Sequence, residues 1–283
     1  MSGYIVSAFA DEYADDFGEQ LAVLRELGIP RIELRHINGK NVIELNETEL
    51  DGVARALRTA GVTVSAIGSP IGKIRADEDI EGHIRAAGRI LAAARLLGTR
   101  YVRIFSLYPP KNASAADWRD TVYRMTERLV TLAEGYGVTL CHENEAGIWG
   151  ESPERCLELL RYFGGRLRCV FDMGNFVLDG YDPAAAYRIL APYIAYFHIK
   201  DALYAGAVVP AGCGEARIAD ILTQHEKYSG TTVAVTLEPH LQTFSGLNAL
   251  TGKAFDNPYK YADRKAAFSD AYARFKALMG GEI

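Results

Sequence analysis

Short runs of hydrophobic and β-branched residues alternate along the chain with longer segments whose apolar residues recur every three or four positions. The short runs predict strands, and the longer segments predict amphipathic helices. Several of the helical segments end in Gly directly before the next run, which is a common helix stop in αβ connections. We expect strands at 4–9, 31–35, 62–67, 101–105, 138–143, 168–173, 194–199 and 233–238.

The predicted strands start about 30 residues apart, which is the length of one strand plus one crossover helix. Eight such units in 283 residues match the size of a (β/α)8 barrel. An open doubly wound sheet is the competing fold, but it would have fewer strands and often a GxGxxG after the first one. We therefore predict an α/β fold with a single TIM-barrel domain over residues 1–283, whose last helix lies within 263–280.

One predicted connection is long and irregular. It covers residues 239–261, after the eighth strand, and is rich in Gly, Asn, Pro and aromatic residues. Loops of this length in a compact barrel are usually lids or substrate walls. We expect such a role here, with a passive surface insertion as the alternative.

Composition narrows the class of protein. The net charge of −5 and the 49 % hydrophobic content are those of an ordinary globular chain, and no Lys/Arg stripe indicates nucleic-acid binding. No run approaches the roughly 18 apolar residues that span a bilayer, and the N-terminus lacks the pattern of a signal peptide. We expect a cytoplasmic protein without a membrane or nucleic-acid partner, whose four cysteines are free thiols rather than disulfides.

Polar residues end four consecutive predicted strands, from the fifth to the eighth. In a barrel these carboxyl ends meet at one mouth, where active sites of this fold are built. Side-chain alternation supports an inward orientation, because the residues one position before the last three of them are large and apolar. The four polar residues are Glu143, Asp172, His198 and Glu238, and the apolar ones are Phe171, Phe197 and Leu237.

Three carboxylates at one mouth, beside the imidazole, would repel each other strongly unless they were protonated or neutralised. A divalent cation resolves this, since oxygen ligands with one imidazole suit Mn²⁺, Mg²⁺, Co²⁺ or Zn²⁺. The sequence therefore predicts a site for one such ion, with Glu143, Asp172, His198 and Glu238 as its ligands.

Further polar residues are expected near the same mouth. Lys200 shares a strand face with His198 and is a candidate contact for a substrate oxygen or phosphate. Lys73 follows the third strand in a Gly/Pro turn that suits an anionic group, and Glu145 and His240 share the faces of Glu143 and Glu238. Each of these also fits an ordinary surface role.

Two residues of the second strand are expected to pair with each other. Glu33 and Arg35 share one strand face, so an ion pair between them is the simple interpretation.

The motifs HENE, FDMGN, HIKD and LEPH, with GCGE between the last two, resemble the sugar phosphate isomerase/epimerase superfamily of xylose isomerase-like TIM barrels. The resemblance covers essentially the whole chain, including SAFADE near the start and IGSPIGK after the third strand. It implies that the four strand-end residues are metal ligands. It also implies that Glu143 and Glu238 act as the acid/base pair on a bound ketose, by proton abstraction next to a carbonyl through an enediolate.

The chain departs from that resemblance at two positions. Ketose 3-epimerases of the superfamily carry a His three residues after the metal Asp and an Arg six residues after the metal His. Here these positions are Asn175 and Tyr204. We keep Asn175 as a candidate substrate contact, but 3-epimerisation of free ketoses does not carry over.

The resemblance implies a metal-dependent isomerase or epimerase of a small carbohydrate, a sugar or a sugar phosphate, with manganese among the candidate ions, and a possible homo-oligomer. A dehydratase of an inosose-like or keto-polyol substrate is the alternative enzyme, because it starts with the same proton abstraction. A sugar-binding barrel without turnover is the alternative from another class. The DNA-repair endonucleases of the superfamily need more histidines than the six of this chain.

Overall fold

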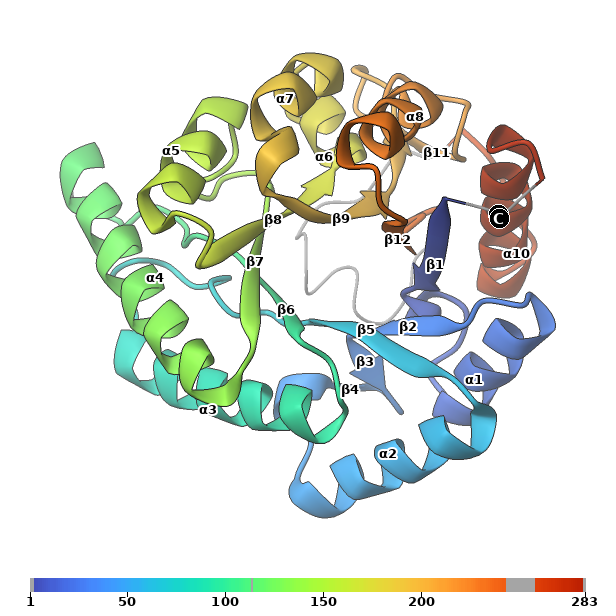
Figure 1. The fold of residues 1–283 in the computed structure, drawn as a ribbon, viewed down its shortest axis with the longest axis horizontal. Coiled ribbons are helices and arrows are strands. Elements are labelled where there is room, and N and C mark those ends of the chain that lie inside the picture. Colours follow the sequence, from blue (N-terminus) through green and yellow to red (C-terminus); the bar gives the residue numbers. More distant parts are fainter. Residues whose placement is uncertain (1–2, 113, 243–257, 282–283) are drawn as a thin grey trace.

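The chain forms a closed barrel of eight parallel strands inside a ring of helices, as Figure 1 shows along the barrel. This computed structural model describes residues 3–112, 114–242 and 258–281. Around the barrel the strands follow the order β1-β12-β9-β8-β7-β6-β5-β2, so chain neighbours are also barrel neighbours. The strands are β1 (Tyr4–Ala8), β2 (Arg31–Leu34), β5 (Thr63–Gly68), β6 (Tyr101–Ile104), β7 (Thr139–Glu143), β8 (Leu167–Asp172), β9 (Ile194–Ile199) and β12 (Val233–Leu237).

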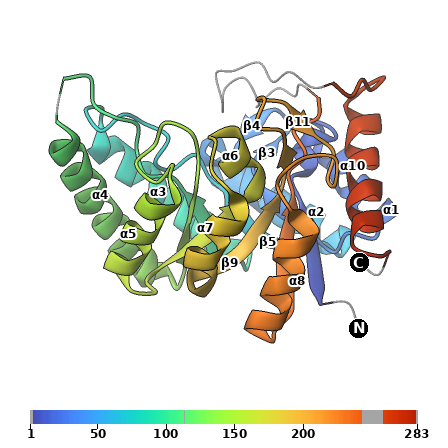
Figure 2. The same cartoon turned by 90° about the horizontal axis from the view of Figure 1, so that it is seen from above.

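The helices pack around the outside of the barrel, and Figure 2 shows them from a second side. They are α1 (Phe17–Glu26), α2 (Glu47–Ala60), α3 (Ile80–Leu96), α4 (Ala115–Tyr136), α5 (Pro153–Phe163), α6 (Met173–Leu178), α7 (Pro183–Leu190), α8 (Ile218–Ser229) and α10 (Arg264–Leu278). Two short hairpins lie outside the barrel sheet: β3 (His36–Ile37) with β4 (Lys40–Asn41), and β10 (Asp201–Ala202) with β11 (Val208–Val209).

The predicted barrel is confirmed. All eight strands lie where the hydrophobic runs predict them, with ends shifted by about one residue, and the predicted last helix is α10. All four cysteines are free, as expected. Residues 243–257 of the predicted lid lie outside the described residues, so that prediction stays open.

Local sequence signals set the helix ends. Asn46 begins α2 with a capping box, in which its side chain accepts from the backbone N–H of Glu49 and the Glu49 side chain accepts from that of Asn46. Gly61 ends the helix with a φ of 69°, a left-handed conformation that glycine adopts at little cost. The same pair of signals, Ser114 and Gly137, bounds α4.

Alternation along the strands separates the barrel interior from the helix layer. The ring of Phe171 lies 5.2 Å from that of Phe176 in α6, and Phe197 lies 4.9 Å from His225 in α8. The intervening positions of neighbouring strands form a separate buried cluster, which consists of Ala66, Cys141, Val170 and Tyr196. The last three precede Glu143, Asp172 and His198 by two residues, so the predicted site residues project into the barrel above this layer.

The segment after β9 is held by Asp201. Its carboxylate accepts backbone N–H bonds from Gly212 (2.8 Å), Gly214 (3.0 Å) and Ala216 (3.0 Å). A Cβ on Gly214 would lie 2.3 Å from Asp201 Oδ1, which explains the glycine there. The GCGE turn is therefore the backbone partner of Asp201.

In the described ranges, no helix combines the length and apolar character that crossing a bilayer requires.

Candidate metal centre

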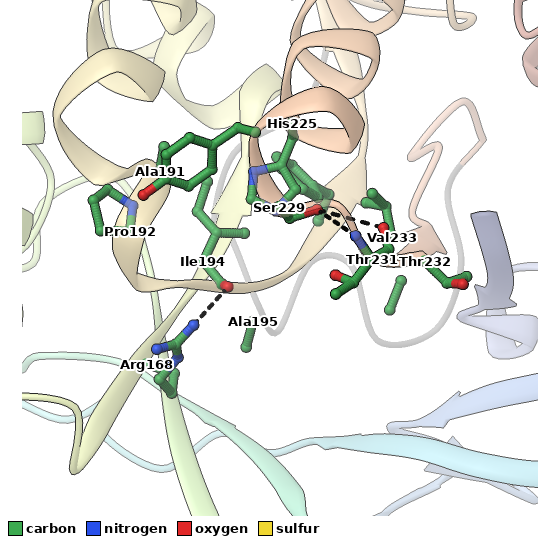
Figure 3. Close-up of a pocket in the computed structure, with 13 residues that line it drawn as sticks. Arg168, Ala191, Pro192, Ile194, Ala195, His225, Ser229, Thr231, Thr232 and Val233 are labelled. Atoms are coloured by element: carbon green, nitrogen blue, oxygen red, sulfur yellow. Dashed lines mark hydrogen bonds between the residues drawn. The ribbon is translucent and has the colours of Figure 1, made fainter. Parts of the chain in front are cut away.

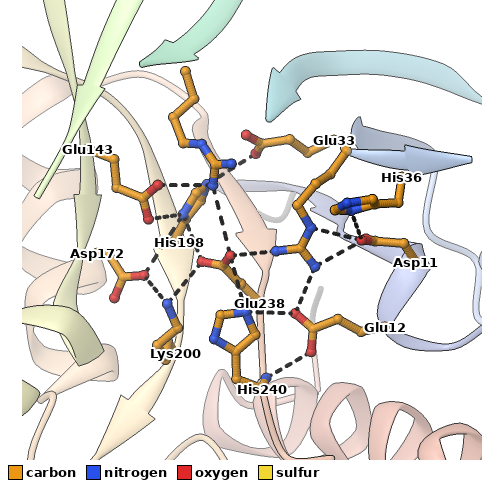
Figure 4. Close-up of polar contacts among 12 residues, drawn as sticks. Asp11, Glu12, Glu33, His36, Glu143, Asp172, His198, Lys200, Glu238 and His240 are labelled. Atoms are coloured by element: carbon orange, nitrogen blue, oxygen red, sulfur yellow. Dashed lines mark hydrogen bonds and ion pairs between the residues drawn. The ribbon is translucent and has the colours of Figure 1, made fainter. Parts of the chain in front are cut away.

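The four predicted ligands converge at the carboxyl-end mouth of the barrel (Figure 4). Glu143, Asp172 and His198 lie on β7, β8 and β9, and Glu238 directly follows β12. Each offers one ligand atom, and these atoms all lie within 4.8 Å of one another. All four side chains are buried. Adjacent strands of a closed barrel thus bring together residues separated by up to 95 positions.

His198 lies at the middle of the group. Its Nδ1 is 2.8 Å from Glu143 Oε1, 3.0 Å from Glu238 Oε2 and 3.9 Å from Asp172 Oδ2. On the opposite edge of the ring, Nε2 is 3.2 Å from Glu33 Oε2. Tyr196 donates its hydroxyl to the other Glu33 oxygen at 2.9 Å, which fixes that carboxylate. Burial opposes the positive charge of the ring, but Glu143, Glu33 and Glu238 outweigh it and raise the pKa of His198, so both nitrogens carry a proton. An ion bound at Nδ1 would replace the proton there, while Nε2 stays with Glu33.

Lys200 adds an ammonium group to the same centre. Its Nζ donates to Asp172 Oδ2 at 2.8 Å, to Glu238 Oε2 at 3.1 Å and to Asn175 Oδ1 at 3.1 Å. The Asn175 amide donates in turn to the carbonyl of Asn144 at 2.9 Å. Asn175 therefore orients Lys200, at the position where the ketose 3-epimerases carry a histidine.

Two arginines contact Glu143 and Glu238, each at the carboxylate oxygen that does not contact His198. Arg103 Nη1 lies 3.0 Å from Glu143 Oε2 and 3.9 Å from Glu238 Oε1. Arg35 Nη1 lies 3.0 Å from the same Glu238 oxygen. Neither guanidinium contacts the oxygens that face His198 at hydrogen-bond distance in the described contacts.

Arg35 also binds the segment after β1. Its Nε donates to Asp11 Oδ2 at 2.8 Å, and its Nη2 lies 3.4 Å from Glu12 Oε1. The expected ion pair between Glu33 and Arg35 is therefore wrong. The strand shifts its register between Ile32 and Glu33, and the two side chains take separate partners, Glu33 at His198 and Arg35 at Asp11.

Burial and neighbouring charges set the protonation of these groups. Burial opposes the ionisation of Glu143, but His198 and Arg103 outweigh it and hold the pKa of Glu143 low. Burial likewise opposes the ionisation of Glu238, and Lys200 and His198 hold its pKa well below the usual value. Burial raises the pKa of Asp172 despite Lys200. Both glutamates are therefore ionised at neutral pH.

The donor set fits a divalent cation. The connected network holds six carboxyl groups and four basic side chains, because its raised pKa makes His198 a cation, and burial raises the pKa of Glu12 to about 8 and that of Asp172 to about 7. A divalent cation among the carboxylates would take the place of the protons that His198 and Asp172 hold. Three oxygen donors and one imidazole nitrogen are ligands that Mn²⁺, Mg²⁺, Co²⁺ and Zn²⁺ accept. The carboxyl groups are Asp11, Glu12, Glu33, Glu143, Asp172 and Glu238, and the basic side chains are Arg35, Arg103, His198 and Lys200.

The remaining predicted site residues lie around this centre. Lys73 forms an ion pair with Glu145 at 2.8 Å, and its Nζ lies 4.3 Å from the centroid of the Phe105 ring. His240 is buried, with Nε2 3.4 Å from Glu238 Oε1 and 3.5 Å from Glu12 Oε1. Its backbone N–H donates to Glu12 Oε2 at 2.8 Å. The φ of 48° at His240 is uncommon for a residue other than glycine.

Glu12, Glu238 and His240 form a second group whose potential ligand atoms lie within 4.8 Å of one another. Arg35 contacts both carboxylates of this group, at 3.4 and 3.0 Å. Burial raises the pKa of Glu12 to about 8 despite Arg35, so this carboxyl is largely protonated at neutral pH. The group is therefore a hydrogen-bonded network next to the first one.

The sequence pattern did not point to Arg103 as a site residue, and Asp11 and Glu12 appeared only as part of SAFADE. Arg103 is 2 % exposed in the middle of a buried strand, and such an arginine requires a charged partner. That signal was visible in the run YVRIF. Asp11 and Glu12 follow β1 at the same mouth as the other strand ends.

A separate cavity of about 190 Å³ lies at the opposite end of the barrel (Figure 3). It is bounded by the amino ends of β9 and β12, and includes Arg168, which donates to the carbonyl of Ile194 at 2.9 Å. None of the predicted site residues lines it.

The protein is thus a closed (β/α)8 barrel with a cluster of carboxylates and one histidine at its carboxyl-end mouth. Residues 21–252 match the family described as xylose isomerase-like TIM barrel. The chain belongs to this family. No curated protein has a significantly similar sequence.

Solved structures show the same fold at low sequence identity. A D-psicose 3-epimerase from Clostridium cellulolyticum H10, solved with D-tagatose, superimposes with a TM-score of 0.77 at 13 % identity, over 96 % of this chain and 97 % of that chain. A xylose isomerase-like TIM barrel protein from Mycobacterium smegmatis, in complex with magnesium, gives 0.72 at 15 % identity over 100 % of both chains. The probable 3-DHS dehydratase AsbF from Bacillus anthracis gives 0.70 at 17 % identity, over 96 % of this chain and 97 % of that chain.

Proposed function

We propose that this protein is a divalent-metal-dependent isomerase or epimerase of a sugar or sugar phosphate. The observation that carries the proposal is the convergence of Glu143, Asp172, His198 and Glu238 from four consecutive strands, with ligand atoms within 4.8 Å. An epimerase solved with a ketose and a family member solved with magnesium share the fold, which supports the proposal.

The four converging residues would hold the ion. When bound, a divalent cation supplies a Lewis acid for a substrate carbonyl and a fixed point for substrate hydroxyl groups. His198 is prepared for this role by Glu33, which holds Nε2 and leaves Nδ1 toward the carboxylates.

Glu143 and Glu238 would also transfer the proton. They approach His198 Nδ1 from two strands, at 2.8 and 3.0 Å, and both are ionised at neutral pH. A carboxylate can remove a proton from carbon next to a carbonyl, and a second one can return it on the other face for epimerisation. In an isomerisation one carboxylate would move the proton between neighbouring carbons.

Lys200 would contact the substrate oxygen that gains negative charge. Although burial opposes its charge, Asp172 and Glu238 raise the pKa of Lys200, so that it stays cationic. A buried cation with fixed orientation stabilises developing negative charge more strongly than one in water. Asn175, Lys73, His240 and Glu145 remain proposed substrate contacts, with Lys73 already paired to Glu145.

The test combines ion stoichiometry with solvent exchange. The protein is stripped of metal, reconstituted with Mn²⁺ and analysed for manganese, and ketoses and their phosphates are then incubated with it in D₂O and followed by NMR. We expect about one ion per chain, and deuterium at the carbon next to the carbonyl of the true substrate.

Variants separate this activity from contamination. Glu143→Gln should lose the exchange, whereas the surface control Glu127→Gln, whose residue pairs with Arg166, should keep it. Loss of water from the substrate after exchange would reassign the enzyme as a dehydratase. Tight sugar binding without exchange would indicate a binding barrel, and no bound ion would refute the proposal.

A further inference from the structure

The two oxygens of each glutamate at the centre have different partners. In Glu143, Oε1 lies 2.8 Å from His198 Nδ1, and Oε2 lies 3.0 Å from Arg103 Nη1. In Glu238, Oε2 lies 3.0 Å from His198 Nδ1, and Oε1 lies 3.0 Å from Arg35 Nη1. We call Glu143 Oε1 and Glu238 Oε2 the inner oxygens, and Glu143 Oε2 and Glu238 Oε1 the outer oxygens.

The two guanidinium groups are fixed in place. The side chains of Arg35 and Arg103 are 0 % and 3 % exposed. Arg35 lies 4.1 Å from the centroid of the Phe9 ring, and Arg103 lies 4.8 Å from that of Phe105. Asp11 accepts two further hydrogen bonds from Arg35, at 2.8 and 3.2 Å. The arginines therefore hold the outer oxygens as part of the packed barrel rather than as mobile surface charges.

A guanidinium on the outer oxygen opposes binding of both oxygens of one carboxylate to the same ion. The fixed positive charge repels a cation that moves toward the outer oxygen, and the N–H bond orients that oxygen away from the centre. Cations differ in how often they bind a carboxylate through both of its oxygens. Ca²⁺ takes six to eight oxygen ligands and often binds carboxylates through both oxygens, whereas Mn²⁺, Mg²⁺ and Zn²⁺ accept fewer ligands.

We propose that Arg35 and Arg103 are positioning residues that set the ion selectivity of the centre. By holding the outer oxygens, they leave each glutamate one oxygen for an ion, and the centre selects small divalent cations against Ca²⁺. This inference rests on the proposed metal centre and concerns which ion it takes.

The test measures two dissociation constants by calorimetry, in wild type and in Arg103→Met. The quantity compared is the dissociation constant of Ca²⁺ divided by that of Mn²⁺. Both ions carry the same charge, so the electrostatic effect of removing one guanidinium cancels in the ratio. The matched control is Lys200→Met, which also removes one positive charge but contacts the inner oxygen of Glu238. Arg103 is preferred to Arg35 for the test because Arg35 also holds Asp11 and Glu12.

We expect the ratio to fall about tenfold or more in Arg103→Met, because Glu143 can then offer both oxygens to Ca²⁺. In Lys200→Met both ions should bind more tightly while the ratio stays within about twofold. An unchanged ratio in Arg103→Met, or an equal fall in both variants, overturns the inference. Wild type that binds neither ion refutes the proposed metal centre itself.

A second measurement uses the unaltered protein, in case Arg103→Met does not fold. Infrared difference spectra of the Mn²⁺-loaded wild type report the separation between the two carboxylate stretching bands. A separation wider than that of free carboxylate indicates one oxygen per ion and supports the inference. A narrower separation indicates two oxygens per ion and overturns it.

Discussion

Glu33 and His198, which are separated by 165 positions in the chain, meet inside the barrel with Oε2 3.2 Å from Nε2. The contact determines which edge of the imidazole faces the proposed ion. Because Nε2 is engaged by Glu33, Nδ1 lies toward Glu143 and Glu238. A carboxylate in this position fixes the ring and increases the basicity of the other nitrogen.

Removing the Glu33 charge should weaken ion binding. We expect Glu33→Gln to raise the Mn²⁺ dissociation constant by roughly 10- to 100-fold, measured by calorimetry. Tyr196→Phe is the control, since it removes only the hydroxyl that supports the other Glu33 oxygen, and should change the constant by less than about threefold. Equal effects of the two variants would show that Glu33 does not act through His198.

Asp172 has two separable roles, as a proposed ligand and as the N-cap of α6. Its Oδ1 accepts the backbone N–H of Asn175 at 2.8 Å, while Oδ2 faces Lys200. Asp172→Asn should raise the Mn²⁺ dissociation constant by about 100-fold or more. Its melting temperature should stay the same, because the amide oxygen still caps the helix. Asp172→Ala should lose the ion and about 1 kcal/mol of stability. Undiminished Mn²⁺ binding in both variants would remove Asp172 from the ligand set.

The buried ring of His142 predicts a loss of stability in acid. Burial lowers the pKa of His142 from 6.5 to about 4, and its Nε2 lies 2.9 Å from Ser106 Oγ. The unfolded chain binds this proton more readily than the folded one, so the stability is complete above about pH 6.5 and falls toward pH 4.

Urea unfolding at two pH values checks this effect. Between pH 7 and pH 5 wild type should lose about 2 kcal/mol more than His142→Gln, which lacks the titrating ring. Equal losses in the two proteins would mean that His142 is not the group that binds the proton.

Asp201 should contribute to stability without contributing to the ion site. Its carboxylate accepts from Gly212, Gly214 and Ala216, so Asp201→Ala leaves these N–H groups without that partner. We expect a loss of about 2–4 kcal/mol in urea unfolding and an unchanged Mn²⁺ affinity. The control Asp220→Asn alters an exposed pair with Arg217 and should cost less than about 0.5 kcal/mol. A large loss of ion affinity in Asp201→Ala would contradict the separation of roles.

Two predictions from the sequence stay open. They are the possible homo-oligomer and the cytoplasmic location.

The amino-acid sequence alone predicts the barrel and the position of the four converging residues. Hydrophobic periodicity is local, so each strand and helix can be recognised within its own segment, and eight repeated units imply closure. Once the strands are parallel and adjacent, their last residues must meet at one mouth. Glu143, Asp172 and His198 could therefore be placed together from their strand ends alone, without any knowledge of side-chain contacts.

Which charged groups pair with one another depends on the tertiary structure. Arg35 takes Asp11 and Glu238 rather than Glu33, and Lys73 takes Glu145. These partners lie 24, 203 and 72 positions apart, and no local pattern encodes them. In a buried mouth with more carboxylates than cations, each guanidinium or ammonium group has several possible partners at similar separation. For Arg35, the register of β2 shifts nearby and the guanidinium packs 4.1 Å from the centroid of the Phe9 ring. Burial makes every unpaired charge costly, so the packed geometry rather than the sequence spacing fixes the pairs.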